Sequence, residues 1–326
     1  MSETATTPLV AIVGPTASGK SSLGVWLAER LGGEVVVCDS TQVYRGFDVG
    51  TAKITVEERR GVPHHLLDLL EPQEVFTAGD YRRRALAVLD DLRGRGKLPV
   101  FTVGTGLYFR ALVEGLADAP ARSEELRARL KKGAQRRGPE YVHRILQRLD
   151  REAAARIAPG DTPKVIRAVE VCLLAGKPLT EVHREGRPRL EGYTALRVGL
   201  IPPRAALYER INARVEAMLA AGWPEEVRRL LASGVPATAK PFQFIGYGEL
   251  RRRLEGKLAI EKAGPSIQQA TRRYAKRQIT WFRREPEVEW FAGFGDDPQI
   301  AAAVLAYLNE QLGSPGLARA PRPGGV

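Results

Sequence analysis

A glycine-rich segment near the N-terminus carries the clearest chemical signal in the sequence. Residues 14–21 read Gly-Pro-Thr-Ala-Ser-Gly-Lys-Ser and follow an apolar run at 9–13. The spacing matches G-x-x-x-x-G-K-[ST], a loop whose backbone N–H groups surround an anion, with the lysine on the terminal phosphate. The serine after the lysine can hold Mg²⁺. The predicted diphosphate-binding residues are Gly14, Pro15, Thr16, Ala17, Ser18, Gly19, Lys20 and Ser21, with Ser21 also the predicted metal ligand.

This loop does not by itself identify the ligand. Small-molecule kinases carry the same loop, so nucleotide binding, ATP included, stays open. The sequence has no Asn-Lys-x-Asp segment of the kind that reads guanine, which argues against a GTPase. A diphosphate or triphosphate is therefore expected at residues 14–21.

An acidic residue follows the second apolar run. Residues 35–38 are Val-Val-Val-Cys, and Asp39 comes next. Ligands bind at the carboxyl ends of strands in open parallel sheets, so Asp39 is expected beside the phosphate loop. A carboxylate there can act as a general base, hold Mg²⁺ or cap a helix. The residues alone leave these three roles open.

The elements that position these residues alternate along the chain. We predict buried strands at 9–13, 35–38, 98–103, 196–201 and 288–291, and helices at 20–31, 80–93, 204–221 and 265–284. Strands alternating with helices predict an α/β fold with a parallel sheet. Together with the phosphate loop, they indicate a P-loop NTPase-like core.

The middle of the chain differs from this pattern. Residues 123–177 are helical in pattern, basic and without a convincing strand. We therefore predict a discontinuous core at 1–115 and 190–312, interrupted by an all-helical insertion domain at 116–189. The end at 313–326 is rich in Gly and Pro, which predicts a disordered tail.

Positive charge is concentrated in two segments. The net charge is +12, and residues 251–284 contain 11 Lys or Arg against 2 acids. Residues 122–151 contain 10 against 4. Such clusters attract phosphate backbones, although a solvated arginine-rich surface explains the charge equally well.

Composition argues against several protein classes. The 2 cysteines, Cys38 and Cys172, argue against a disulfide scaffold or a cysteine zinc site. No apolar run is long enough to span a membrane, and no signal segment opens the chain. We expect a cytoplasmic protein without membrane association or an obligate protein partner, and a monomer.

Three further segments match a known family. They are Cys-Asp-Ser-Thr-Gln-Val-Tyr-Arg-Gly at 38–46 with Asp-Val-Gly-Thr-Ala-Lys at 48–53, Gly-Thr-Gly-Leu-Tyr-Phe-Arg-Ala-Leu at 104–112, and Thr-Arg-Arg-Tyr-Ala-Lys-Arg-Gln-Ile-Thr-Trp-Phe-Arg at 271–283. With the phosphate loop, and in this order, they closely resemble the bacterial tRNA dimethylallyltransferase family over about residues 9–292. Val103 departs from the family pattern, which usually has glycine there. The chain also lacks the zinc-finger ligands that eukaryotic relatives append.

The resemblance implies an activity and its partners. A dimethylallyl group would pass from dimethylallyl diphosphate to N6 of adenine 37, beside the anticodon of tRNA, with Mg²⁺ as cofactor and diphosphate released. Asp39 would be the general base, and the Thr105 hydroxyl would stabilise the leaving diphosphate, unless Thr105 is only a turn or helix-capping residue. The implied tRNA-binding residues, which would contact the anticodon stem-loop, are Asp39, Ser40, Thr41, Gln42, Thr105, Arg127, Pro163, Lys164, Val165, Ile166, Arg167, Gln243, Phe244, Ile245, Gly246, Tyr247, Gly248, Lys276, Arg277, Gln278, Ile279, Thr280, Trp281, Phe282 and Arg283.

Several side chains keep two interpretations. Arg210 and Arg214, one helical turn apart, either reach the diphosphate or lie on a solvated face. The adjacent His64 and His65 should point apart, so we predict a structural role for them. Aromatic side chains can stack on unpaired bases but more often pack in a core; the candidates are Phe242, Phe244, Tyr247 and Trp281.

Three other functions compete with tRNA prenylation. A kinase for a small metabolite would use the same loop for ATP but gives no role to the basic helix at 265–284. A transferase that prenylates free AMP or ADP needs no large basic surface. The third alternative is a non-catalytic RNA-binding ATPase.

Overall fold

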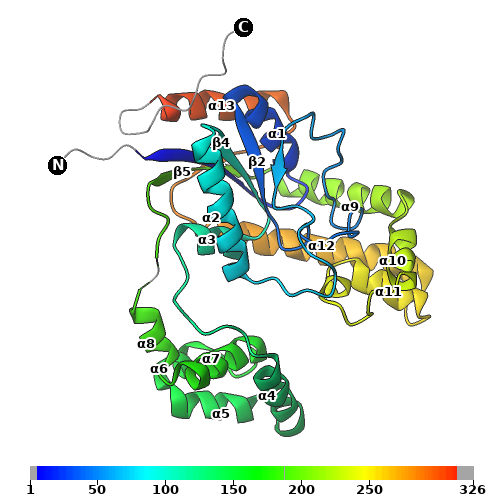
Figure 1. The fold of residues 1–326 in the computed structure, drawn as a ribbon. Helices are drawn as coiled ribbons and strands as arrows, with labels where there is room; N and C mark the ends of the chain where they lie inside the picture. Colours follow the sequence, from blue (N-terminus) through cyan, green and yellow to red (C-terminus); the bar gives the residue numbers. More distant parts are fainter. Residues whose placement is uncertain (1–5, 187, 314–326) are drawn as a thin grey trace, which may run out of the picture. The chain divides into compact units, whose positions relative to one another are not determined.

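The structure is a computed structural model that describes residues 6–186 and 188–313 (Figure 1). The described residues fall into two compact units, one within 1–113 and 191–326 and the other within 114–190. The helical unit was expected at 116–189. Of the tail expected at 313–326, residues 314–326 lie outside the described residues.

The first unit is built on a parallel sheet of six strands. Its order is β3-β2-β4-β1-β5-β6, and every neighbouring pair is parallel. In the centre of the sheet, Val10 is opposite Val100 on one side and Leu196 on the other. The strands are β1 (Thr7–Val13), β2 (Gly33–Cys38), β3 (His64–His65), β4 (Leu98–Val103), β5 (Tyr193–Leu200) and β6 (Val288–Phe291). The α/β class and the five predicted strands are confirmed.

The edge strand β3 was not predicted because it is only two residues long. It pairs with β2. The side chains of its two histidines hydrogen-bond to neighbouring protein groups, which agrees with their predicted structural role. His64 Nδ1 lies 2.8 Å from the Val62 carbonyl, and His65 Nε2 lies 2.7 Å from a Glu34 carboxylate oxygen. Burial lowers the pKa of His64, which keeps that ring neutral near pH 7.

Helices cover the sheet and extend beyond it. Helix α1 packs on β2 and β4, and α13 packs on β5. The predicted helices at 20–31, 80–93, 204–221 and 265–284 are confirmed with small shifts, whereas α13 was not among them. The helices of this unit are α1 (Lys20–Leu31), α2 (Ala78–Gly94), α3 (Gly106–Val113), α9 (Arg204–Ala220), α10 (Trp223–Ala232), the 3₁₀ helix η1 (Lys240–Gln243), α11 (Tyr247–Leu254), α12 (Ile260–Phe282) and α13 (Pro298–Leu312).

The second unit contains only helices among its described residues. They are α4 (Glu124–Arg137), α5 (Pro139–Leu149), α6 (Arg151–Arg156), α7 (Thr162–Ala175) and α8 (Leu179–Arg184), drawn in green in Figure 1. The unit has a core of its own around Val142, Leu146, Val165 and Val169. None of the described helices of the chain is long and apolar enough to cross a membrane.

Candidate active site

A cavity of about 880 Å³ lies in the first unit where β1, β2 and β4 end. The loop after β1, the segment after β2, helices α9 and α12 and residues 243–245 all contribute to its wall. Of the predicted site residues, it is lined by Thr16, Ala17, Ser18, Gly19, Lys20, Ser21, Asp39, Ser40, Thr41, Gln42, Gln243, Phe244, Ile245, Arg277 and Gln278. The predicted donor and base residues therefore meet at one site.

The phosphate loop has the backbone of an anion site. Gly14, Ala17 and Gly19 all have positive φ, at 147°, 64° and 87°, which turns the chain tightly before α1. No side chain caps the first turn of α1, and no acid lies in it. The hydroxyl of Ser18 is fully buried and has no hydrogen-bond partner among the described residues. The helix N-terminus and this hydroxyl are thus left to a ligand.

Lys20 is held inside the loop. Its ammonium donates to the carbonyls of Gly14 at 3.0 Å and Pro15 at 2.7 Å. The pKa of Lys20 is lowered to about 7, mainly by burial, with Asp39 opposing the shift and Arg214 adding to it. A bound phosphate would restore the charged form, because an opposite charge favours it.

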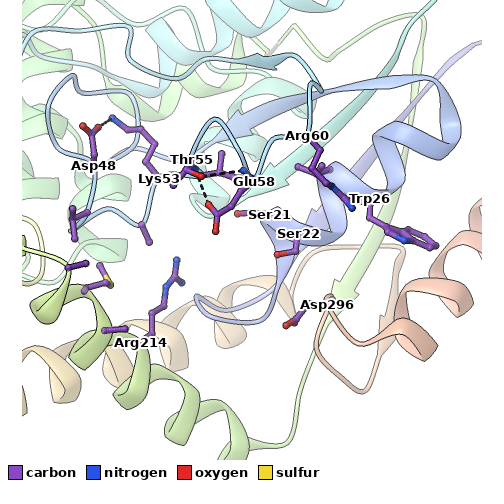
Figure 2. Close-up of a pocket in the computed structure, with 18 of the residues that line it drawn as sticks. Ser21, Ser22, Trp26, Asp48, Lys53, Thr55, Glu58, Arg60, Arg214 and Asp296 are labelled. Carbon is purple, nitrogen blue, oxygen red and sulfur yellow. Dashed lines mark hydrogen bonds and ion pairs between the residues drawn. The ribbon is translucent and has the colours of Figure 1, made fainter.

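The structure separates the two arginines of α9. Arg210 makes two hydrogen bonds to the carboxylate of Asp296, at 2.8 and 2.5 Å. Arg214 makes no hydrogen bond or ion pair with a described residue, and burial lowers its pKa. It lines the main cavity and a second one of about 850 Å³ beside it, where Figure 2 shows it across from Ser21. Arg214 is therefore the arginine available to an anion.

The two carboxylate oxygens of Asp39 have different surroundings. Oδ1 accepts hydrogen bonds from the Thr41 N–H at 2.8 Å and the Thr41 hydroxyl at 2.6 Å. Oδ2 accepts none from a described residue, and it lies 2.2 Å from where a side chain at Gly104 would begin. Glycine is thus required at 104, and one oxygen of Asp39 is left to take a proton.

Thr105 is turned toward the segment after β2. Its hydroxyl accepts from the Ser40 N–H at 3.0 Å and donates to Ser40 Oγ at 3.1 Å. Thr105 is not among the residues lining the cavity. In this arrangement its hydroxyl orients Asp39–Gln42, and a direct contact with diphosphate would require the bond to Ser40 to be exchanged.

Gln278 connects α12 to two parts of the site. The side chain is 6% exposed; Oε1 accepts from the Thr16 N–H at 2.7 Å and Nε2 donates to the Gly104 carbonyl at 2.9 Å. One turn earlier, the Tyr274 hydroxyl donates to the same carbonyl at 3.3 Å. The sequence assigned Gln278 to tRNA contact only. The available signal in the sequence was an uncharged polar residue within an otherwise basic helix.

Comparisons with known proteins give the family. The family model described as IPP transferase matches residues 42–285. The chain belongs to this family. The tRNA dimethylallyltransferase of Koribacter versatilis is 54% identical over 92% of this chain and 97% of its own. That of Geobacter metallireducens is 46% identical over 95% and 100%.

Solved structures agree with this assignment to the IPP transferase family. The full-length tRNA isopentenylpyrophosphate transferase of Bacillus halodurans has a TM-score of 0.69 at 38% identity, over 93% of this chain and 96% of that one. A eukaryotic dimethylallyltransferase acting on tRNA has a TM-score of 0.80 over 97% and 82%. At 24% identity, the latter likeness shows the fold alone.

The predicted tRNA-binding residues of α12 are divided by burial in this family member. Lys276, Arg277, Thr280 and Arg283 are exposed, whereas Phe282 is buried and Ile279 half-buried. The Arg110 guanidinium lies over the Trp281 ring, 4.5 Å from the ring centre, and the same ring packs against Gly106. The exposed basic residues are therefore the ones free to meet RNA.

Of the other aromatic candidates, two lie in the core. Phe242 and Tyr247 are buried and pack on Phe47. Phe244 is half-buried and lines the cavity. Phe244 is thus the member of the four predicted aromatic candidates that lines this cavity. Its neighbours Gly246 and Gly248 do not line the cavity.

In the helical unit, several predicted contacts are occupied within the protein. Arg127 and Arg167 both bind the fully buried carboxylate of Glu170, at 2.9 and 2.7 Å. Val165 and Ile166 are buried in the unit's core. Pro163 and Lys164 are exposed at the start of α7. Of the residues predicted to contact tRNA in this unit, the accessible ones are therefore mainly those at the start of α7.

Sequence reasoning missed Glu226. This buried acid of α10 accepts from the N–H groups of Asp48 and Val49 at 3.0 and 2.8 Å, and from the Tyr247 hydroxyl at 2.5 Å. It holds the backbone that leads to Gly50 in the cavity wall. An acid within an otherwise apolar helix face was the available signal.

Proposed function

We propose that this chain transfers a dimethylallyl group from dimethylallyl diphosphate to N6 of adenine 37 in tRNA. One observation carries the proposal: the phosphate loop and the Asp39 carboxylate line the same cavity. Family membership and relatives named tRNA dimethylallyltransferase support it.

The donor diphosphate would bind at the N-terminus of α1. The donors that face this region are the loop amides, the Ser18 hydroxyl, Lys20, and Arg214, which has no ion-pair partner among the described residues. The diphosphate gains negative charge as its bond to the allylic carbon breaks. Groups whose interactions with the diphosphate become stronger as this charge grows lower the activation barrier.

The acceptor amine would lose its proton to Asp39. The lone pair of adenine N6 is delocalised into the ring, so the amine becomes acidic only as it attacks the allylic carbon. The N–C bond forms, the C–O bond to diphosphate breaks, and one N6 proton moves to the free Oδ2 of Asp39. Oδ1 stays with Thr41 and keeps the carboxylate oriented.

The residues present fit a Mg²⁺ ion held partly by the donor. Ser21 offers an exposed hydroxyl at the cavity, but no cluster of three His, Cys, Asp or Glu suited to a metal exists among the described residues. Mg²⁺ keeps several waters and binds substrate phosphates, and the serine hydroxyl of a phosphate loop can supply a protein ligand. When bound, the ion would neutralise charge on the diphosphate.

The tRNA would approach along α12. Arg277 lines the cavity, Arg273 and Lys276 are exposed on the same helix, and Arg283 is exposed directly after its end. An unpaired adenine can be turned out of the anticodon loop into such a cavity. Contacts by the helical unit, the monomeric state and a cytoplasmic location stay predictions.

A label-transfer experiment tests this function against its competitors. The protein is given labelled dimethylallyl diphosphate or γ-labelled ATP, and then tRNA or AMP, in four separate reactions. We expect label only in tRNA and only from dimethylallyl diphosphate. Label transfer to AMP, or from ATP to any acceptor, would contradict the proposal.

A further inference from the structure

Residues 294–296, which follow β6, pack against the phosphate loop. The Gly295 N–H donates to the Ser18 carbonyl at 2.8 Å. Phe294 and Ala17 both pack against the apolar cluster formed by Leu207, Ile211 and Ala275. Ala17 has a φ of 64°, an unfavourable conformation for a residue with a side chain. Such a conformation persists only where its surroundings enforce it, and residues 294–296 are part of those surroundings.

The same segment places a negative charge beside the anion site. A methyl group added at Gly19 would lie 2.6 Å from Asp296 Oδ1, so this carboxylate lies against the start of α1. Figure 2 shows Asp296 on the wall of the second cavity, which Ser21 and Ser22 also line. Left alone, this carboxylate would oppose a bound diphosphate, because like charges disfavour each other.

Arg210 neutralises this carboxylate. Its two terminal nitrogens bond separately to the two oxygens of Asp296, and its guanidinium lies 4.6 Å from the Phe294 ring centre. Both side chains of the pair are partly exposed, each with 39% of its surface accessible to solvent. These hydrogen bonds lower the pKa of Asp296, so the carboxylate is charged near neutral pH. Arg210 thus contacts two residues of the 294–296 segment.

We propose that Arg210 is a positioning residue that acts through Asp296. It cancels the charge that Asp296 places beside the phosphate loop, while Arg214 contacts the diphosphate itself. The inference rests on the proposed function only in requiring that the loop binds a diphosphate. Asp296 and the phosphate loop both lie outside the family-model match at 42–285.

The test is a rescue experiment on diphosphate affinity. Calorimetry would measure binding of inorganic diphosphate and dimethylallyl diphosphate, with Mg²⁺ present, to full-length wild type, Arg210→Met, Asp296→Asn and the double variant. We expect Arg210→Met to weaken binding about tenfold, the scale of one nearby like charge. The double variant should return to within about threefold of wild type, because the charge that Arg210 balanced is gone.

Two results would overturn the proposal. A double variant as weak as Arg210→Met means that Arg210 contacts the ligand directly. An Arg210→Met protein with wild-type affinity means that the charge of Asp296 does not act on the diphosphate site. Arg214→Met gives the contrast: its weak binding should persist whether or not Asp296→Asn is added.

Controls separate binding from folding. Arg251→Met removes a similarly exposed ion pair with Glu255; neither residue lines either cavity, so diphosphate affinity should be unchanged. Thermal unfolding would identify any variant that fails to fold. If Arg210→Met does so, Asp296→Asn alone decides: affinity at or above wild type agrees with the proposal, and a tenfold fall contradicts it. A wild-type protein that binds neither compound would instead refute the proposed function.

Discussion

The side chain of Gln278 joins the phosphate loop to the end of β4, accepting from the Thr16 N–H at 2.7 Å and donating to the Gly104 carbonyl at 2.9 Å. Gln278 lies on α12, whose exposed face carries Lys276 and Arg277. One buried amide therefore connects the proposed donor loop, the strand end next to Asp39, and the helix proposed to bind tRNA.

Replacing Gln278 by Met should raise the KM for dimethylallyl diphosphate about tenfold. Methionine keeps the volume but leaves the Thr16 N–H unpaired, which costs about 1–3 kcal/mol of loop stability. The matched control is Gln268→Met on the same helix, which removes a 3.1 Å hydrogen bond to Glu216 away from the cavity. Steady-state kinetics and thermal unfolding would be compared. Equal KM values for the two variants would show that Gln278 has no role in donor binding.

Replacing Asp39 by Asn should slow chemistry much more than binding. Asparagine can still accept from Thr41, but it cannot take the N6 proton. The single-turnover rate at saturating substrates should fall about 10²–10⁴-fold, the usual contribution of a general base. The tRNA affinity should change by less than about 1–2 kcal/mol. Lost Mg²⁺-dependent diphosphate binding with an unchanged rate would make Asp39 a metal ligand instead.

Charge reversal of Arg273 and Arg277 to Glu should raise the KM for tRNA and flatten its salt dependence. Phosphate contacts release counterions, so fewer contacts give a shallower slope of log K against log salt. Donor affinity should stay nearly intact. Reversal of the exposed Arg84 and Lys97, in the same unit but away from α12, is the control. A similar tRNA defect in both double variants would point to net charge rather than this helix.

Donor affinity should fall as pH rises from 7 to 9. Without ligand, burial holds the pKa of Lys20 at about 7, and a bound diphosphate raises it. At a pH between these two pKa values, binding of the diphosphate is therefore accompanied by uptake of a proton. Each unit rise in pH in this range then weakens donor affinity by at most about tenfold. Below pH 7 the lysine is already charged, and this dependence disappears.

The check is calorimetry in buffers of different ionisation enthalpy. The Lys20→Met variant should bind the donor weakly. The pH dependence of its donor affinity should reflect only the titration of the diphosphate itself. Wild-type affinity that matches the Lys20→Met pH profile in shape would rule out proton uptake by Lys20.

Local pattern was enough to predict the sheet and the meeting of its loops. Runs such as Val35–Cys38 are typical of buried strands. The strand ends of a parallel sheet share one edge, so Asp39 and Lys20 lie close together. Strand β3 was missed because two residues give no periodicity. Helix α13 lies beyond the last predicted strand, where the sequence was assigned to the core without an element.

Long-range side-chain pairing was not accessible from the sequence. Arg210 and Arg214 look equivalent by spacing, and only the fold brings Asp296, 86 positions away, to one of them. The same holds for Arg127, whose partner Glu170 lies on another helix. Ion pairs between distant segments leave no local pattern, so these roles required the structure.

Product mapping tests the central claim most directly. The protein is incubated with labelled dimethylallyl diphosphate and an anticodon stem-loop bearing adenine at position 37, and the RNA is digested to nucleosides for chromatography and mass spectrometry. The account predicts one dimethylallyl group per RNA, on N6 of that adenosine, with one diphosphate released. It also predicts no product when guanine replaces the adenine. Label at another nucleotide, or diphosphate release without modified RNA, would contradict the account.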